Sequence, residues 1–127
     1  MEESIKDVNA LTLAYIGDAV FELEVRKHFF LTGSQRVDKL HKRVTDTVNA
    51  KSQSEMIAKI ENILTEEETA VYHRGRNAKA MTAAKHQSIV DYRRATGFEA
   101  LFGYLYLRGD EKRISELLDI CFDEDTE

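Results

Sequence analysis

A helical repeat of apolar residues between about Val8 and Phe30 constrains the fold of this chain more than any other feature. Residues at intervals of three and four form one stripe, which consists of Leu11, Ala14, Tyr15, Asp18, Ala19 and Glu22. A second, wholly apolar stripe consists of Leu13, Ile16, Val20 and Leu23. The pattern predicts an α-helix that is apolar over most of its circumference, with Asn9 as its N-cap and Gly33 as its end. Such a helix is expected at the centre of a helical bundle, and part of its surface could also lie at an interface.

The next part of the sequence predicts shorter helices. Ser34 is a candidate cap for a helix whose apolar face consists of Val37, Leu40, Val44 and Val48. The pattern continues less regularly to Leu64, and a separate helix that begins near Asn49 is one interpretation. Thr65 and Glu68 have the spacing of a capping box, which predicts the start of another helix.

The C-terminal third of the chain predicts a loop and two more helices. No helical period is evident in residues 78–87, so we expect an exposed basic loop there. A second nearly all-apolar helix is predicted to begin at Ser88 or Asp91 and to end at Gly109. A final helix is predicted from about Asp110.

Composition supports an all-α fold. The chain has no proline, only 6 glycines in 127 residues, no Asn-Gly or Asp-Gly pair, and no sustained alternation of apolar and polar residues. This length fits one domain with a core of its own. We therefore interpret residues 1–127 as a single helical domain with a short acidic tail from about residue 123.

The single cysteine and the N-terminus indicate where the protein works. Cys121 has no partner for an internal disulfide and stands among apolar residues, so a small core residue in a reducing, cytoplasmic compartment is expected. The sequence starts with Met-Glu-Glu-Ser and contains no uninterrupted long apolar run. We therefore expect neither a signal peptide nor a membrane span.

The charge is distributed unevenly along the chain. The net charge is −5, yet residues 71–94 contain six basic residues and only one acid, Asp91. The basic residues of this segment are Arg74, Arg76, Lys79, Lys85, Arg93 and Arg94. The segment thus carries +5 and the rest of the chain −10. This asymmetry suggests a polyanion-binding face, although chance and a purely protein-binding role remain alternatives.

Two carboxylates stand in unusually apolar surroundings. Asp18 follows Tyr-Ile-Gly and precedes Ala-Val-Phe, and Glu99 follows Gly-Phe and precedes Ala-Leu-Phe. Because an uncompensated buried carboxylate is costly, the two acids suggest a divalent cation held between the two central helices. Gly17 and Gly97 beside them predict a close approach of helices. The alternative is that each acid lies at a solvent edge or pairs with a lysine or arginine.

Both acidic segments resemble motifs of the ribonuclease III family. Residues 15–20 read Tyr-Ile-Gly-Asp-Ala-Val, like the family's signature helix, and residues 98–107 read Phe-Glu-Ala-Leu-Phe-Gly-Tyr-Leu-Tyr-Leu, like its second acidic helix. Val48 and Asn49 match a Val-Asn pair of the helix between them. The chain ends shortly after the second motif, and residues 73–79 read His-Arg-Gly-Arg-Asn-Ala-Lys. On these grounds the chain is most similar to the Mini-ribonuclease III branch, which has no separate RNA-binding domain.

The resemblance implies a homodimeric endoribonuclease that cleaves double-stranded RNA, with precursor large-subunit ribosomal RNA as the expected substrate and a ribosomal protein as a candidate partner. Asp18 and Glu99 are the implied catalytic metal ligands, for Mg²⁺ with Mn²⁺ as a substitute. Leu11 and Tyr15 are expected at the dimer interface. The expected RNA-binding residues are Arg74, Arg76, Asn77, Lys79, Lys85 and His86.

The sequence departs from the family pattern at two positions. Ala14 and Thr96 stand where classical members carry two further acids, which leaves the number of metal ions open. The same departures favour the alternative of an inactive RNA-binding helical dimer that acts in ribosome assembly. Glu22, one turn after Asp18, could orient a water, or it could be an ordinary surface acid.

Overall fold

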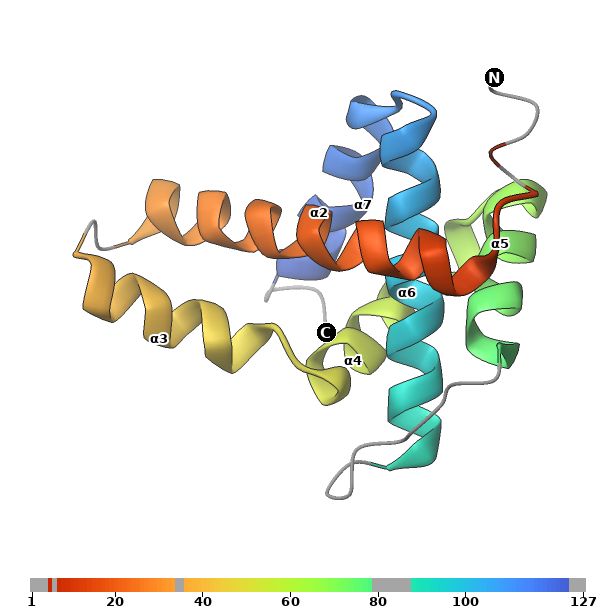
Figure 1. Cartoon of the computed structure of the whole chain (residues 1–127). Helices are drawn as coiled ribbons and strands as arrows, with labels where there is room; N and C mark the ends of the chain where they lie inside the picture. The colour runs from red at the N-terminus through yellow and green to blue at the C-terminus, as the bar shows by residue number, and fades with distance from the viewer. Residues whose placement is uncertain (1–4, 6, 34–35, 79–87, 124–127) are drawn as a thin grey trace.

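The computed structural model describes residues 5, 7–33, 36–78 and 88–123. Its described residues form helices and no strand, which confirms the all-α prediction (Figure 1). The elements are α2 (Ala10–Thr32), α3 (Val37–Thr47), α4 (Ala50–Ile60), the short 3-10 helix η1 (Glu61–Ile63), α5 (Glu66–Asn77), α6 (Ile89–Leu107) and α7 (Glu111–Phe122).

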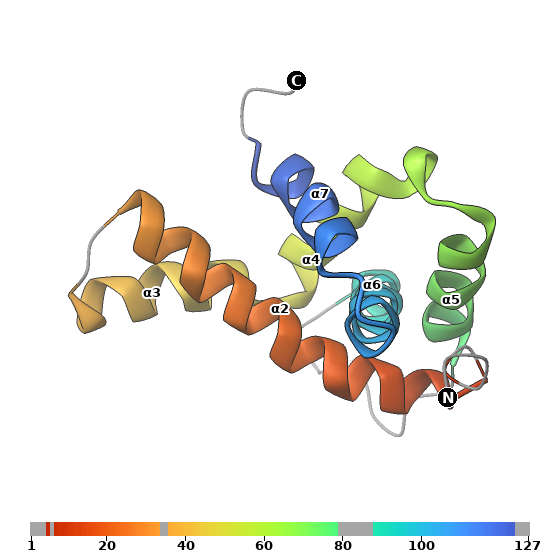
Figure 2. The ribbon, with the colours of Figure 1, turned by 90° about the horizontal axis from the view of Figure 1, so that it is seen from above.

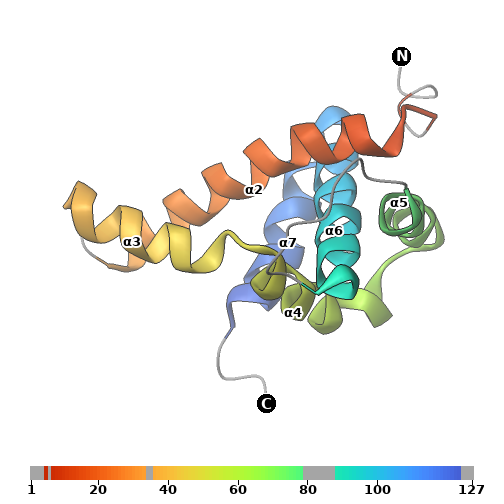
Figure 3. The same ribbon diagram turned by 60° about the horizontal axis from the view of Figure 1, so that its bottom comes forward.

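Helix α6 is the central element of the bundle. It packs against α2, α4, α5 and α7, and the view from above shows these helices arranged around it (Figure 2). Its residues 95–105 are buried with the exception of Glu99, which is half-buried. The C-terminal part of α2 and helix α3 form a hairpin that extends away from the rest of the bundle (Figure 3). Because residues 95–105 of α6 are apolar around most of the helix, this part can be covered by its four neighbouring helices, while the two ends of α6 stay exposed.

The helix ends follow the local signals in the sequence. Asn9 caps α2 by accepting a hydrogen bond from the amide of Leu11 at 2.8 Å, and Gly33 ends that helix. The interpretation that a separate helix begins near Asn49 is confirmed. The Asn49 side chain accepts a hydrogen bond from the Ser52 amide and caps the start of α4. Val48 and Asn49 therefore lie between two helices and not within one. The predicted cap at Ser34 lies outside the described residues.

The later boundaries also depend on side-chain caps. Thr65 and Glu68 form both hydrogen bonds of a capping box at the start of α5. Ser88, and not Asp91, caps α6 by accepting from the Asp91 amide. Asp110 caps α7. Gly109, in the turn between α6 and α7, has a positive φ of 78°, a conformation that glycine adopts without strain.

Glycines set the closest helix contacts. A Cβ added to Gly17 would overlap the backbone carbonyl of Glu99, and one added to Gly103 would overlap the carbonyl of Leu13. Gly17 and Gly103 therefore let α2 and α6 cross with their backbones in contact. The close approach predicted at Gly97 is confirmed, and its partner is Tyr72 of α5. Gly103 is the glycine of α6 that faces α2.

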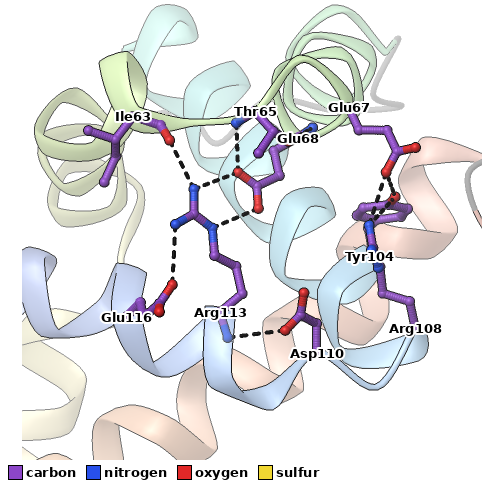
Figure 4. A network of polar contacts seen from close by, with 9 residues as sticks. All are labelled: Ile63, Thr65, Glu67, Glu68, Tyr104, Arg108, Asp110, Arg113 and Glu116. Atoms are coloured by element: carbon purple, nitrogen blue, oxygen red, sulfur yellow. Dashed lines mark hydrogen bonds and ion pairs between the residues drawn. The ribbon is translucent and has the colours of Figure 1, made fainter.

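A polar network ties α5 to the end of α6 and to α7 (Figure 4). Arg113 donates two hydrogen bonds of 2.8 Å to the buried carboxylate of Glu68 and one of 2.9 Å to the carbonyl of Ile63. Glu67 accepts from the hydroxyl of Tyr104 at 2.6 Å and from Arg108 at 3.0 Å. The acids at the start of α5 thus serve to hold α5 against α6 and α7.

The core contains Cys121, as predicted. Its side chain is buried, and burial raises the pKa of its thiol to about 12, so it remains protonated at neutral pH. Within the described part of the chain, no helix has both the length and the apolar character that crossing a membrane requires.

Candidate active site

The structure brings Asp18 and Glu99 together at the crossing of α2 and α6. Asp18 directly follows Gly17, and Glu99 supplies the carbonyl that Gly17 touches, so the backbone contact delivers both side chains to one place. The two carboxyl groups share a hydrogen bond. Two acids that are distant in the sequence therefore converge as a result of helix packing, and neither is neutralised there by a lysine or arginine among the residues described.

The surroundings of Glu99 disfavour its negative charge. Desolvation by burial, followed by repulsion from the nearby Asp18 carboxylate, raises the pKa of Glu99 to about 8. A hydrogen bond from the Gln53 amide at 3.2 Å acts in the opposite direction but is too weak to offset this effect. Without a cation, the protonated form of Glu99 is therefore favoured at neutral pH.

This electrostatic conflict is one that a divalent cation would relieve. Hard carboxylate oxygens suit Mg²⁺, which usually takes one or two protein carboxylates and completes its shell with waters and phosphate oxygens. Asp18 and Glu99 fit that requirement. Among the described residues, at this site or elsewhere, no group of three or more His, Cys, Asp or Glu side chains could hold a metal. Ala14 and Thr96 are both buried, and Thr96 donates its hydroxyl to the carbonyl of Tyr92.

Gln53 is a part of the site that sequence reasoning missed. It lies on α4, its side chain is buried, and its amide contacts the Glu99 carboxylate. A signal was present, because Gln53 stands three and four residues before the buried Met56 and Ile57 and so shares their face. Glu22 is an ordinary surface acid, paired with Arg26 at 2.6 Å.

The predicted RNA-binding residues lie near the end of α5. Arg74 donates a hydrogen bond of 2.8 Å to the carbonyl of Val8, which anchors the segment before α2. Arg76 lies over the ring of Tyr72, and its Nε contacts the side-chain oxygen of Asn77. The carboxylates of Glu67 and Glu68 bind Arg108 and Arg113, as described above. The other predicted residues, Lys79, Lys85 and His86, lie outside the described residues.

The predicted interface residues are exposed on α2. The side chain of Tyr15 is 79% exposed and that of Leu11 is 37% exposed. Tyr15 borders a groove of about 670 Å³ between α2 and α7, whose other lining residues include Ile16, Asp18, Ala19, Val20, Leu23, Tyr106 and Ile114. The groove is largely apolar and reaches the acidic pair at Asp18.

The fold and the site define a helical domain whose two carboxylates, Asp18 and Glu99, meet at a helix crossing. Comparison with known proteins identifies the class to which such a domain belongs. The ribonuclease III domain family matches residues 11–110. Proteins named Mini-ribonuclease 3 are similar over nearly the whole chain. That of Clostridium tetani is 45% identical and is matched over 94% of this chain and 80% of its own length, and that of Enterococcus faecalis is 42% identical over 91% and 89%.

A solved structure supports the same conclusion. A crystal structure of a protein from Fusobacterium nucleatum superimposes with a TM-score of 0.81 at 37% identity, covering 92% of this chain and 93% of the other. The chain therefore belongs to the ribonuclease III family, within its Mini-ribonuclease 3 group, and is an endoribonuclease.

Proposed function

We propose that this endoribonuclease cleaves double-stranded RNA with the help of Mg²⁺ held by Asp18 and Glu99, and that its substrate in the cytoplasm is precursor large-subunit ribosomal RNA. The observation that carries the metal assignment is the convergence of the two carboxyl groups, with the pKa of Glu99 raised to about 8. Family membership supports the type of reaction. The nature of the natural RNA follows from the resemblance alone.

In this proposal each residue of the site has a defined task. Asp18 and Glu99 supply oxygen ligands from two helices, and Gln53 holds the Glu99 carboxylate in place through its amide. Held by these two carboxylates, Mg²⁺ would supply Lewis-acid chemistry, lowering the pKa of water and offsetting negative charge on the phosphate. The backbone contact between α2 and α6 holds both carboxylates on rigid elements, which favours a reproducible geometry.

Binding of the duplex is assigned to the basic segment around the α5–α6 connection. A-form RNA is recognised mainly through its phosphates and 2′-hydroxyls, which cations and amides can contact without reading the sequence. We include Arg74, Arg76, Asn77, Lys79, Lys85 and His86 in this surface. Arg74 has a structural role as well, because it donates a hydrogen bond to the carbonyl of Val8.

A second copy of the chain is proposed to cover the exposed face of α2. Leu11, Tyr15 and Leu23 are exposed on this helix, and the apolar groove between α2 and α7 continues that surface. A two-fold pair uses the same patch twice. Because Asp18 lines the groove, such a pair would bring its two acidic sites to one shared face, as two strands of a duplex require.

The test is cleavage of a labelled RNA duplex in Mg²⁺ and in EDTA, together with a sedimentation measurement of the mass. We expect cleavage in Mg²⁺ only, a mass of two chains, and a loss of several orders of magnitude in rate for Asp18→Asn. Glu22→Gln is the matched control, since Glu22 lies on the same helix and pairs with Arg26. Duplex binding without Mg²⁺-dependent cleavage would instead support an inactive RNA-binding dimer, and near-normal turnover by Asp18→Asn would refute the metal site.

A further inference from the structure

A second hollow lies on the other side of α6 from the acidic pair. It has a volume of about 270 Å³ and is lined by Glu61, Tyr72, Arg76, Asn77, Val90, Arg93 and Arg94. Three of these residues are arginines, which come from the end of α5 and the start of α6. Arg93 and Arg94 are not among the residues that the sequence assigned to RNA binding. We refer to this hollow as the arginine pocket.

The arginines of the pocket have weak partners within the protein. Among the described residues, no carboxylate lies within ion-pair distance of Arg76 or Arg93, and that of Glu61 is 3.9 Å from Arg94. Arg76 contacts the Asn77 oxygen and lies 5.8 Å from the centre of the Tyr72 ring. With three cations and one acid, the pocket carries a local charge of +2. Such guanidinium groups retain free donors for an anion.

Tyr72 organises the pocket. Its side chain is buried, and it packs against Gly97, where any Cβ would collide with the tyrosine ring and carbonyl. Its hydroxyl shares a hydrogen bond with Arg94, and its ring lies under Arg76. Two of the three guanidinium groups are thus positioned by one rigid side chain. This pre-organisation lowers the entropy cost of binding a ligand.

The size and chemistry of the pocket indicate a phosphate group. Guanidinium groups match phosphate oxygens in geometry and charge. A volume of about 270 Å³ lies just below the usual range for small-molecule sites, so a phosphate fits better than a large ligand. The lining includes Asn77 and Val90, which flank the α5–α6 connection that we assign to RNA binding.

We propose that the arginine pocket binds a backbone phosphate of the RNA duplex, with Arg76, Arg93 and Arg94 as its ligands. The inference rests on the proposed function, because it takes double-stranded RNA as the substrate. The pocket would anchor the RNA backbone on the face of α6 opposite the acidic pair, independently of base sequence. Glu61 at its edge opposes the anion, so it would limit the affinity.

The test compares binding of a labelled RNA duplex by the wild-type protein and by Arg93→Gln/Arg94→Gln, in EDTA and over a range of salt concentrations. We expect a Kd at least about tenfold higher for the double variant. The plot of the logarithm of the association constant against the logarithm of the salt concentration has a negative slope. The magnitude of this slope should decrease by about one unit for each pocket that contacts the duplex. Glu61→Gln should have the opposite effect and tighten binding. Lys112→Gln, which removes an exposed cation of α7, is the control and should change little.

Three further measurements make the outcome decisive. Arg93→Gln alone, at an exposed position, guards against a folding defect, and its thermal unfolding is compared with that of the wild type. Titration with inorganic phosphate shows whether the pocket serves a free anion; loss of phosphate binding with unchanged duplex affinity and salt slope would overturn the assignment to RNA. Wild-type cleavage in Mg²⁺ is scored separately. If the wild type cleaves RNA and both arginine variants bind it as tightly as the wild type, the pocket proposal alone is overturned. If the wild type does not cleave RNA in Mg²⁺, the proposed function is overturned.

Discussion

Gly17 of α2 lies directly against the backbone carbonyl of Glu99 of α6, with no room between them for a methyl group. The next residue after Gly17 is Asp18, whose carboxyl group shares a hydrogen bond with the side chain of Glu99. One backbone contact therefore both closes the core and assembles the acidic pair. Gly103 makes the reciprocal contact with Leu13. The geometry of the site is set by a helix crossing and not by loops.

Gly17→Ala is expected to destabilise the protein and to reduce cleavage. Alanine normally favours a helix over glycine by about 1 kcal/mol, but its Cβ would overlap the Glu99 carbonyl and force the helices apart. We expect a net loss of about 1–3 kcal/mol or more in the free energy of unfolding, measured with urea. Gly33→Ala is the control, because its Cβ would mainly meet the end of the flexible Arg43 side chain and would lie 3.2 Å from the Phe29 carbonyl oxygen. Equal stability of both variants would contradict a close α2–α6 contact.

The metal-free protein is expected to lose stability as the pH rises from about 4.5 to about 8. Over this range Glu99 keeps its proton in the folded state, where burial and Asp18 raise its pKa to about 8, but has lost it in the unfolded state. The unfolded state therefore binds fewer protons, and the free energy of unfolding decreases with increasing pH.

Thermal unfolding in EDTA between pH 5 and pH 8 measures this effect. Glu99→Gln cannot ionise and should remove most of the dependence, whereas Glu22→Gln should preserve it. Addition of Mg²⁺ at pH 8 should restore stability to the wild type and not to Glu99→Gln. If Glu99→Gln follows the wild-type pH profile, the two carboxylates are not coupled as described.

Arg113→Met is expected to destabilise the protein strongly, because it leaves the carboxylate of Glu68 buried without its partner. Burial acts to raise the pKa of Glu68, but hydrogen bonds from Arg113 and from the Thr65 amide outweigh it, so the pKa lies below 4.5. Loss of one member of a buried ion pair costs about 3–5 kcal/mol. The contribution of this pair in the wild type should also decline as the pH falls below 4.5, when Glu68 becomes protonated.

Urea unfolding of three variants separates this buried pair from surface effects. The double variant Arg113→Met/Glu68→Leu should recover much of the stability lost in Arg113→Met, since no charge is then left unpaired. Arg26→Met removes a pair that is exposed on both sides and should cost at most about 1 kcal/mol. Similar losses for Arg113→Met and Arg26→Met would show that the Glu68–Arg113 pair contributes no more than a surface ion pair.

Local patterns in the sequence predicted the elements well. Asn9, Asn49, Thr65 and Asp110 all cap helices at or near the expected positions, because capping depends on side chains within a few residues. The apolar runs of α2 and α6 predicted the two central helices. The choice of Asp18 and Glu99 also came from their immediate neighbours, together with a family resemblance.

Contacts between distant segments could not be predicted in this way. Gln53 reaches Glu99 only because α4 packs on α6, and Arg74 binds Val8 only because α5 packs near the start of α2. Gly97 indicated a close helix approach, but only the tertiary structure shows that the approaching helix is α5.

The sequence by itself determined where the helices run and how most of them begin. It also showed which two carboxylates stand in apolar surroundings, where their charge is energetically unfavourable. Only the tertiary structure decided that these carboxylates meet, that Gly103 completes the crossing, and that three arginines gather around Tyr72. The physical reason is one of range. Hydrogen bonds of caps and turns act between near neighbours in the chain, whereas the crossing of two helices depends on the packing of side chains from the whole core.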